Sequence, residues 1–491
     1  MTSALPANTP VLVGVGFAQQ KEDDISKAKE AVLLMEEALR AAAADAGADA
    51  VLSQASKIIS PQGLWGYTDP ARLLANAVGA EQAKTVMGLF GITQQTLIGR
   101  ACESVAKGED DVVFVVGGEA KYRALRGQIS GQEVTETAQD DAPDVTLSPE
   151  KELYIDAEIN SGLGMLPVGY YAIMDSAYRH SKGWTVEQHR DKLGQLYAGF
   201  SRVAETNPYA WKREAHDADS IRNASDKNPM LAFPYTKLHN SSWNVDQASA
   251  MIICSVEKAQ ALGVPREKWV FPLASAESNY MLTMSQKAEL HRLPGAKLAG
   301  DAAYKAAGIS AEELDFVELY SCFLAAVEIY ADELNIPNDM PLTVAGGMPF
   351  AGGPLNNYSF QSTCRMAQLL REKPNSKGLV STVSGLLTKQ AVGIWSTEPA
   401  PNGFVFEDVS EQARAEINVK TVTENHSGEG TIAGYTVVYE NKARKRAITV
   451  MDFTDGVRSL AWTEDESIMQ AMEESEWCGK VLSVVDGEIN V

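Results

Sequence analysis

The sequence predicts an α/β protein made of two halves with the same order of elements, followed by a small β-barrel. Three observations support this prediction. Apolar, strand-like runs alternate with amphipathic helical patterns up to about residue 400, which is typical of α/β folds. The element order from residue 268 onward repeats that of the first half, which indicates an internal duplication. Short alternating strands then replace this pattern near the C-terminus.

The first half opens with a buried strand that ends in glycines. Strand-like runs lie at residues 10–18, 56–60 and 112–116, and helical patterns at 27–46 and 70–80. Between residues 85 and 120 the pattern is a strand, a tight turn at Gly91, a helix of about four turns and a strongly apolar strand. Residues 241–256 return to strand character, so the first half is expected to span residues 1–255.

An insertion is predicted at residues 121–240, where the composition changes. Residues 127–151 are polar and acidic and should form a loop, and helical patterns follow at 170–181 and 186–206. Basic residues stand out there in an otherwise acidic chain. They form either a solvated helical face or a seat for a phosphorylated ligand, for which the candidates are Arg179, Lys182, Arg190 and Lys212.

The second half, residues 256–405, repeats this order. Strands are expected at residues 269–276, 316–320 and 342–345, helices at 296–307 and 360–371, and a hairpin at 378–384 and 391–396. After residue 405 five short strands are expected at 416–423, 431–439, 446–453, 458–462 and 479–485, with a helix at 466–474. Five strands with one helix before the last suggest a barrel of the OB type over residues 406–491.

Charge and cysteine usage narrow the function class. The net charge is −22 and the pI is near 4.8, which argue against nucleic acid or an anionic membrane as a general partner. The five cysteines form no CxxC pair, so neither a disulfide framework nor a zinc site is expected, and no metal is predicted. No apolar run is long enough to span a membrane and no signal-peptide pattern opens the chain. A cytoplasmic protein is therefore expected.

Cys322 lies where the strand 316–320 gives way to a helical pattern. A thiol at a helix N-terminus meets unpaired N–H groups and the positive end of the helix dipole, which favour the thiolate. This is a plausible position for reactive chemistry. The alternative is a small buried residue in a packed βα unit.

Four stretches of the chain resemble the thiolase superfamily over roughly residues 8–400. They are TQQTLIGRACESVAKGEDDVVFVVGGEA, NSSWNVDQASAMIICS, LDFVELYSCFLAAVEI and GGMPFAGGPLNNYS. With the appended barrel, the chain is most similar to sterol-carrier-type, thiolase-like proteins of type 1, often labelled acetyl-CoA acetyltransferases. The resemblance implies a duplicated βαβαβαββ fold in five αβαβα layers, and a loop domain that handles coenzyme A or acyl-CoA.

At the key positions this sequence departs from the pattern that the resemblance implies. The nucleophile of the thiolase Cys-x-Ser motif falls on Gly91, and the His of Gly-His-Pro falls on Gly353. The second cysteine, of Cys-x-Gly, falls on Val383. Cys322 is retained, with Tyr320 where the sterol-carrier type has His. Ordinary thiolase activity is therefore not expected.

Other side chains remain as catalytic candidates. Cys322 could act as an acid/base or a displaced nucleophile. Tyr320 and Tyr358 are similar to the tyrosines used by thiolase-superfamily aldolases that lack the cysteine. Asn357 could supply an amide donor to an oxyanion, although Asn also suits a tight turn. For Tyr358 the alternative is a packed ring with its hydroxyl bonded to the backbone.

Three function hypotheses follow. The first is an acyl-CoA-binding protein or acyltransferase of lipid metabolism, centred on Cys322. The second is a retro-aldol carbon–carbon lyase acting on acyl-CoA side chains, with a tyrosine as acid/base. The third is a non-catalytic lipid carrier or scaffold whose barrel recruits a protein partner. The sequence leaves the oligomeric state open between monomer and dimer.

Overall fold

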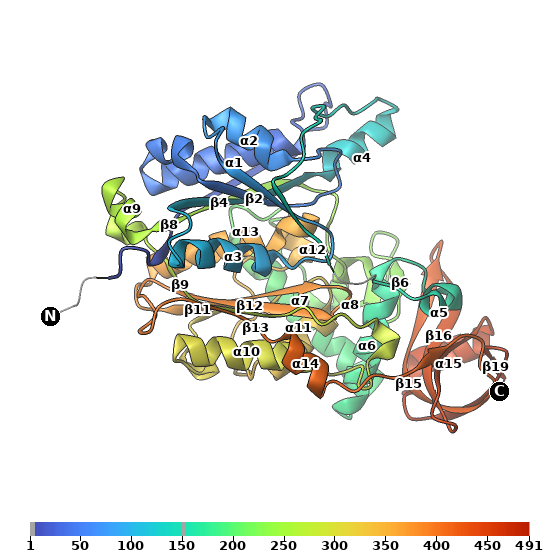
Figure 1. Ribbon diagram of the computed structural model, residues 1–491. Coiled ribbons are helices and arrows are strands. Elements are labelled where there is room, and N and C mark those ends of the chain that lie inside the picture. Colours follow the sequence, from blue (N-terminus) through green and yellow to red (C-terminus); the bar gives the residue numbers. More distant parts are fainter. Residues whose placement is uncertain (1–4, 150–152, 491) are drawn as a thin grey trace.

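The computed structural model describes residues 5–149 and 153–490 of the chain, and its main body has five layers. Figure 1 shows two sheets with helices above, between and below them. The layer above holds α1 (Ala31–Ala46) and α2 (Pro70–Val78), the middle layer α3 (Gln94–Ala106) and α13 (Tyr358–Glu372), and the layer below α10 (Pro294–Ala307). The predicted αβαβα arrangement is therefore present.

The first sheet has the order β1-β8-β4-β2-β3-β5. Its strands are β1 (Pro10–Gln20), β2 (Lys57–Pro61), β3 (Lys84–Gly88), β4 (Val112–Ala120), β5 (Val145–Leu147) and β8 (Asp246–Ser255). β2, β3 and β4 run parallel because α2 and α3 provide the crossovers between them, whereas β8 is antiparallel to both β1 and β4. The apolar run 112–116 is buried throughout, as expected for a strand covered on both faces.

Close contact between α1 and β1 explains the glycines of the first strand. A Cβ atom at Gly16 would lie 1.9 Å from the carbonyl oxygen of Ala38, and one at Gly14 would lie 2.2 Å from that of Ala42. Glycine on the strand and alanine on the helix thus allow the two backbones to approach. The helix ends at Gly47, which has a φ of 68°.

The second sheet has the order β10-β11-β12-β9-β13. Its strands are β9 (Phe271–Ser278), β10 (Phe316–Glu318), β11 (Lys377–Ser384), β12 (Lys389–Ser396) and β13 (Val405–Asp408). The order β9-β12-β11-β10 repeats β1-β8-β4-β2 with the same strand directions, which supports the predicted duplication.

The strand predicted at residues 342–345 is wrong. Leu342 does accept a hydrogen bond from the backbone of Leu319, at the position where β3 stands in the first half. The next three residues, however, donate to the buried carboxylate of Glu318 instead of to a neighbouring strand. The buried Glu318 carboxylate therefore accepts the hydrogen bonds that a neighbouring strand would accept at this edge of the sheet.

The insertion packs against one end of the two sheets. It contains α4 (Lys121–Ser130), α5 (Asp156–Glu158), α6 (Pro167–Ser181), α7 (Val186–Thr206), α8 (Ala218–Arg222), β6 (Met230–Ala232) and β7 (Tyr235–Thr236). The predicted bounds of α7 are confirmed, and a capping box between Thr185 and Gln188 begins the helix. The prediction of a continuous loop at 127–151 is wrong in part, because α4 reaches Ser130 and β5 pairs with β3.

The C-terminal segment closes into a five-stranded barrel. Its strands are β15 (Gly428–Glu440), β16 (Ala443–Phe453), β17 (Arg458–Thr463), β18 (Val481–Val485) and β19 (Glu488–Asn490), and α15 (Glu466–Glu474) precedes the last two. Pairing runs β15–β16–β17–β19–β18 and back to β15. The strand predicted at 416–423 is wrong except for β14 (Val422–Thr423), because α14 (Ser410–Glu416) ends there, and β19 supplies the fifth strand.

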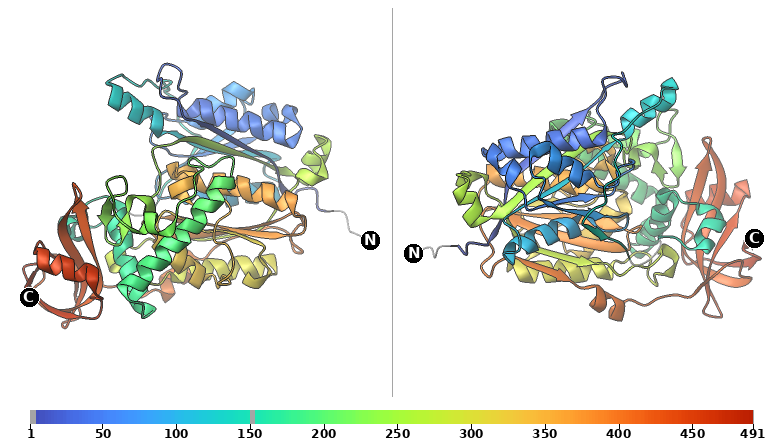
Figure 2. Two further views of the ribbon diagram at one scale, coloured as in Figure 1. Left: turned by 180° about the vertical axis from the view of Figure 1, so that it is seen from behind. Right: turned by 45° about the horizontal axis from the view of Figure 1, so that its top comes forward.

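The barrel is joined to the insertion by both backbone and side chains. Val438 of β15 pairs with Ala232 of β6, which extends the barrel sheet into the insertion. Figures 1 and 2 show the barrel at one end of the molecule beside α6, with α9 (Val256–Ala261) at the other end.

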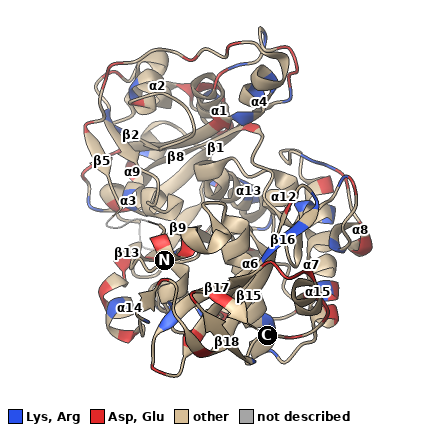
Figure 3. Cartoon of the chain, turned by 90° about the vertical axis from the view of Figure 1, so that its right-hand side faces the viewer, with Lys and Arg blue, Asp and Glu red and all other residues tan. Residues whose placement is uncertain are grey.

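Charges of both signs are spread over the helices and loops, as Figure 3 shows. None of the helices in the described part of the chain is long and apolar enough to cross a membrane.

Candidate functional site

The turn between β10 and α11 (Leu324–Glu333) carries two of the predicted catalytic residues, Tyr320 and Cys322. Glu318, the last residue of β10, is fully buried. Its Oε2 accepts hydrogen bonds from the backbone N–H groups of Val344 (2.7 Å) and Ala345 (2.9 Å) and from the hydroxyl of Thr343 (2.9 Å). Burial raises the pKa of Glu318, although these donors act in the opposite direction.

Tyr358 is bonded to the other oxygen of this carboxylate. Its hydroxyl donates to Glu318 Oε1 at 2.7 Å and accepts from Ser321 Oγ at 3.4 Å. Ser321 Oγ in turn accepts from the backbone N–H of Met348 at 3.0 Å. A carboxylate, a phenol and a hydroxyl thus form one buried chain, and its members come from β10, α13 and the turn before α11. Tyr358 bonds a carboxylate side chain, so the alternative of a hydroxyl bonded to the backbone is wrong.

The ring of Tyr320 packs edge-on against the ring of Tyr358. Its ring centroid lies 5.8 Å from that of Tyr358 at an interplanar angle of 86°, and its backbone N–H donates to Ser381 Oγ at 2.9 Å. The side chain of Gln94, at the start of α3, interacts with the Tyr320 hydroxyl. Burial raises the pKa of Tyr320, so the phenol is neutral at ordinary pH. Tyr320 is 8% exposed whereas Tyr358 is 0% exposed, so Tyr320 is the more accessible tyrosine.

Cys322 lies next to these tyrosines and is partly exposed. The prediction of a favoured thiolate is wrong, because burial raises the pKa of the thiol to about 12 despite the nearby Tyr171 hydroxyl and the backbone N–H of Phe323. The first residue of α11 is Leu324, two positions later, and Phe323 caps it. The thiol is therefore a neutral group in this arrangement.

Asn357 points away from the tyrosines. Its Nδ2 donates to Ser249 Oγ at 3.1 Å, on β8 of the first sheet. Its Oδ1 faces Gly117 of β4, where a Cβ atom would lie only 3.1 Å away. The amide proposed as an oxyanion donor is thus used to join α13 to the first sheet.

Comparisons with known proteins show which proteins this chain resembles. No family model matches the sequence. An acetyl-CoA acetyltransferase of Methanocaldococcus jannaschii is 28% identical over 165 residues, which are 34% of this chain. The chain spans 40% of the length of that relative. A crystal structure of a monomeric SCP2-thiolase-like protein type 1 from Mycobacterium smegmatis is 28% identical, covers 99% of this chain and 100% of its own, and superposes with a TM-score of 0.83.

The chain belongs to the thiolase-like superfamily. The resemblance inferred from four sequence stretches is thereby confirmed, as is the α/β fold with its C-terminal barrel. An Ltp2–ChsH2(DUF35) aldolase shares the fold with a TM-score of 0.61 at 18% identity, over 80% of this chain and 98% of its own.

Gly91 of this thiolase-like chain stands three residues before α3 and has a φ of 98°. A Cβ atom there would lie 2.9 Å from Pro149, so both backbone conformation and space favour glycine. Lys389 donates from Nζ to the Gly91 carbonyl at 2.8 Å. The ammonium group of Lys389 therefore lies at the turn that precedes α3.

The glycines after α12 (Met348–Ala351) are also tightly enclosed. Gly352 has a φ of 98°, and a Cβ atom there would lie 2.1 Å from Gln247 Oε1. At Gly353 a Cβ atom would lie 3.2 Å from the Cβ of Ser241. Larger residues at these two positions would need the surrounding loop to move.

Three of the four basic residues predicted to bind coenzyme A interact with other side chains of the protein. Arg179 is 1% exposed and donates to Glu476 at 2.9 Å and to the hydroxyl of Tyr435 at 2.8 Å, both in the barrel segment. This gives Arg179 a structural position between insertion and barrel. Lys182 pairs with Asp332 at 2.5 Å. Arg190 lies over the ring of Phe233.

Lys212 is placed differently, beside α12. Its backbone N–H donates to Phe350 O at 2.8 Å and its Nζ donates to Pro349 O at 3.3 Å. Burial, together with the nearby charges of Lys237 and Lys21, lowers the pKa of Lys212 to about 8. A cavity of about 260 Å³ adjoins the same turn and is lined by Phe17, Ala18, Gln19, Pro208, Tyr209, Gln247, Ala248 and Gln361.

Two residues of the site were missed from the sequence. Glu318 was assigned to a buried strand without a role, although a carboxylate inside an apolar run signals a buried polar network. Gln94 accepts from the backbone N–H of Ser359 at 2.6 Å and so connects the two halves. Its position at the start of α3 gave no sequence signal.

Proposed function

We propose that this protein binds an acyl-CoA thioester and cleaves a carbon–carbon bond of its acyl group by retro-aldol chemistry. The observation that carries the proposal is the neutral phenol of Tyr320, supported by the Glu318–Tyr358 pair, beside a Cys322 thiol whose pKa is about 12. Gly91 and Gly353, on which the sequence resemblance places the thiolase nucleophile and histidine, provide no side chain for covalent catalysis. An aldolase is among the proteins that share this fold.

The proposed step acts on a 3-hydroxyacyl-CoA. The C2–C3 bond breaks and its electron pair moves to C2, while the C3–O bond becomes a carbonyl and the hydroxyl proton leaves. A neutral phenol accepts that proton on oxygen while it gives its own proton to C2. Tyr320 therefore ends the step unchanged, and the products are a carbonyl compound and a shortened acyl-CoA. Tyr358 and Glu318 act as positioning residues in this scheme.

The test is incubation of the full chain with acyl-, 3-ketoacyl- and 3-hydroxyacyl-CoA esters, with and without free coenzyme A. We expect shortening of the 3-hydroxyacyl esters alone, without free coenzyme A and with no change in the intact protein mass. An acyl adduct on Cys322 that free coenzyme A removes would show that the protein catalyses acyl transfer and is not a lyase. If none of the esters is turned over, the lyase proposal is wrong and the acyl-CoA-binding function must be tested alone.

We place the coenzyme A phosphates at Lys212, with Lys21 and Lys237 nearby. An ammonium is charged below its pKa, so raising the pH from 7 to 9 through the Lys212 pKa of about 8 removes the positive charge. We expect the affinity for a non-hydrolysable acyl-CoA thioether to fall about tenfold over that range, as one proton is lost on the free protein. Calorimetric titration at each pH measures this change.

Two variants control this prediction. Lys212→Arg keeps the charge up to pH 9, so its affinity should not change with pH. Lys182→Ala, which removes a lysine paired with Asp332, should bind like the wild-type protein. If the affinity of Lys212→Arg falls between pH 7 and 9 as it does in the wild-type protein, Lys212 is not part of the phosphate site.

A further inference from the structure

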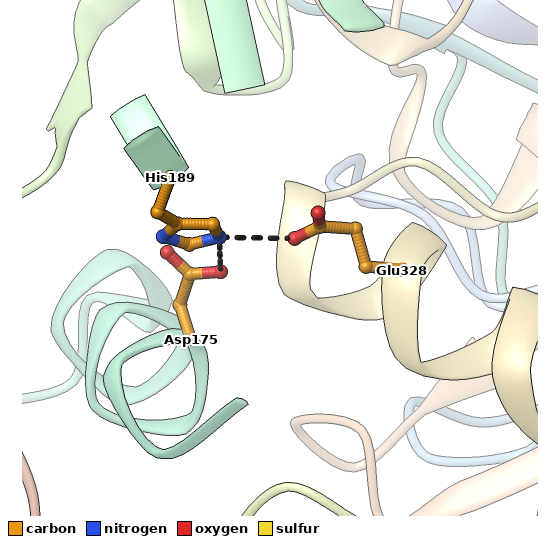
Figure 4. Close-up of side chains that lie close together, drawn as sticks. All are labelled: Asp175, His189 and Glu328. Atoms are coloured by element: carbon orange, nitrogen blue, oxygen red, sulfur yellow. Dashed lines mark hydrogen bonds and ion pairs between the residues drawn. The ribbon is translucent and has the colours of Figure 1, made fainter. Parts of the chain in front are cut away.

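Two consecutive helices of the insertion and one helix of the second half bring a histidine and two carboxylates together. Figure 4 shows Asp175 of α6, His189 of α7 and Glu328 of α11 pointing toward one another. His189 Nε2 lies 3.3 Å from Glu328 Oε2 and 3.6 Å from Asp175 Oδ1. One ligand atom from each residue lies within 4.8 Å of the other two.

This cluster is deeply buried and incompletely bonded. The side chains of Asp175 and His189 are 0% exposed and that of Glu328 is 12% exposed. Within the described residues, the two carboxylate oxygens of Asp175 and the Nδ1 of His189 make no hydrogen bond of good geometry, although the side chain of Tyr235 interacts with Asp175. A fully buried carboxylate with so few donors is costly when ionised, since its charge has lost its hydration without full replacement. These carboxylate and imidazole atoms are therefore available to bind a further group, such as an ion.

A protonated His189 would offset part of this cost, since its Nε2 lies within ion-pair distance of both carboxylates. Arg179, one turn along α6, is the closest cationic side chain on that helix, but its guanidinium donates to Glu476 and Tyr435. With a neutral imidazole and both carboxylates ionised, which is the state that binds a metal ion, the cluster carries two negative charges. A divalent cation would neutralise both.

The distances fit a metal ion of a particular kind. Bonds of 2.0–2.2 Å at tetrahedral angles place neighbouring ligand atoms about 3.3–3.6 Å apart. The two distances from His189 Nε2, 3.3 and 3.6 Å, fall in that range. Imidazole nitrogen with two carboxylate oxygens suits zinc and related transition ions better than magnesium or calcium, which prefer oxygen ligands alone.

We propose that Asp175, His189 and Glu328 form a binding site for one divalent transition-metal ion, with zinc as the preferred ion. Three protein ligands leave a fourth position for water, and the slightly exposed Glu328 gives the ion a route of entry. The ion would join two insertion helices to α11, the helix that follows Cys322. The site is separate from the proposed lyase chemistry and does not depend on it.

The test uses the full chain after removal of metal with a chelator. Titration with Zn²⁺ should show one bound equivalent and raise the Tm by several degrees, whereas Mg²⁺ and Ca²⁺ should change neither. Co²⁺, as a spectroscopic substitute, should give the intense visible absorption of a tetrahedral site. These readouts do not require catalytic activity.

Conservative variants identify the ligands. Asp175→Asn, His189→Gln and Glu328→Gln should each lose the Co²⁺ absorption and weaken Zn²⁺ binding at least tenfold. Glu328→Gln is the variant least disruptive to folding, because this side chain is the most exposed of the three. His180→Gln, at the exposed end of α6, is the matched control and should bind like the wild type. Absence of stoichiometric Zn²⁺ binding in the wild type, or binding unaltered in all three variants, would overturn the proposal.

Discussion

Tyr320→Phe is expected to lower the turnover of 3-hydroxyacyl-CoA by two to four orders of magnitude, on the order of 10²–10⁴-fold. The change removes the hydroxyl that we propose exchanges protons with the substrate, while it keeps the ring contact with Tyr358. Acyl-CoA affinity should stay within about threefold of wild type, since the proton shuttle acts in the transition state and not in binding. Steady-state kinetics together with calorimetric titration separate the two effects.

Cys322→Ala is the matched control, two residues away on the same turn. Because burial keeps the thiol neutral, its loss should leave turnover nearly unchanged. The opposite pair of results, with Cys322→Ala inactive and Tyr320→Phe active, would assign the chemistry to the cysteine and contradict the lyase proposal. If both variants keep full activity, neither residue is catalytic.

Arg458→Met is expected to destabilise the attachment of the barrel by about 3 kcal/mol, the lower end of the range for breaking a buried ion pair. The Arg458 side chain is 0% exposed, and it bonds Asp452 twice at 2.8 Å. It also donates to the backbone carbonyls of Ser285, Lys287 and Ala288 in the second half. Methionine fills the space but leaves these acceptors without a donor. Thermal unfolding and limited proteolysis should show a lower Tm and earlier cleavage between α14 and β15.

Lys445→Met on β16 is the control for this variant. Lys445 is 51% exposed and pairs with Glu440, so its loss should change stability by less than about 1 kcal/mol. Equal stability of Arg458→Met and Lys445→Met would show that the buried arginine does not hold the barrel in place.

The sequence was sufficient for the fold wherever apolar periodicity and turn residues acted locally. The bounds of α7 were predicted correctly because Thr185 and Gln188 begin the helix and the apolar face repeats along it. The strand 342–345 was mispredicted because its backbone bonds a carboxylate, Glu318, that lies 25 or more residues earlier. In the barrel the short β19 was missed, since a three-residue strand is specified by its neighbours and not by its own pattern.

The sequence alone determined the superfamily, the duplication and the barrel, and it named Tyr320, Cys322 and Tyr358 as candidates, because these follow from motif order and local pattern. Only the tertiary structure decided the state of those groups. Burial keeps the Cys322 thiol protonated, and Glu318 reaches Tyr358 across the 40 residues that separate them. Asp175, His189 and Glu328 have no motif spacing, since they meet only when α6, α7 and α11 pack together. Desolvation and long-range contact act through the folded shape, so no linear pattern records them.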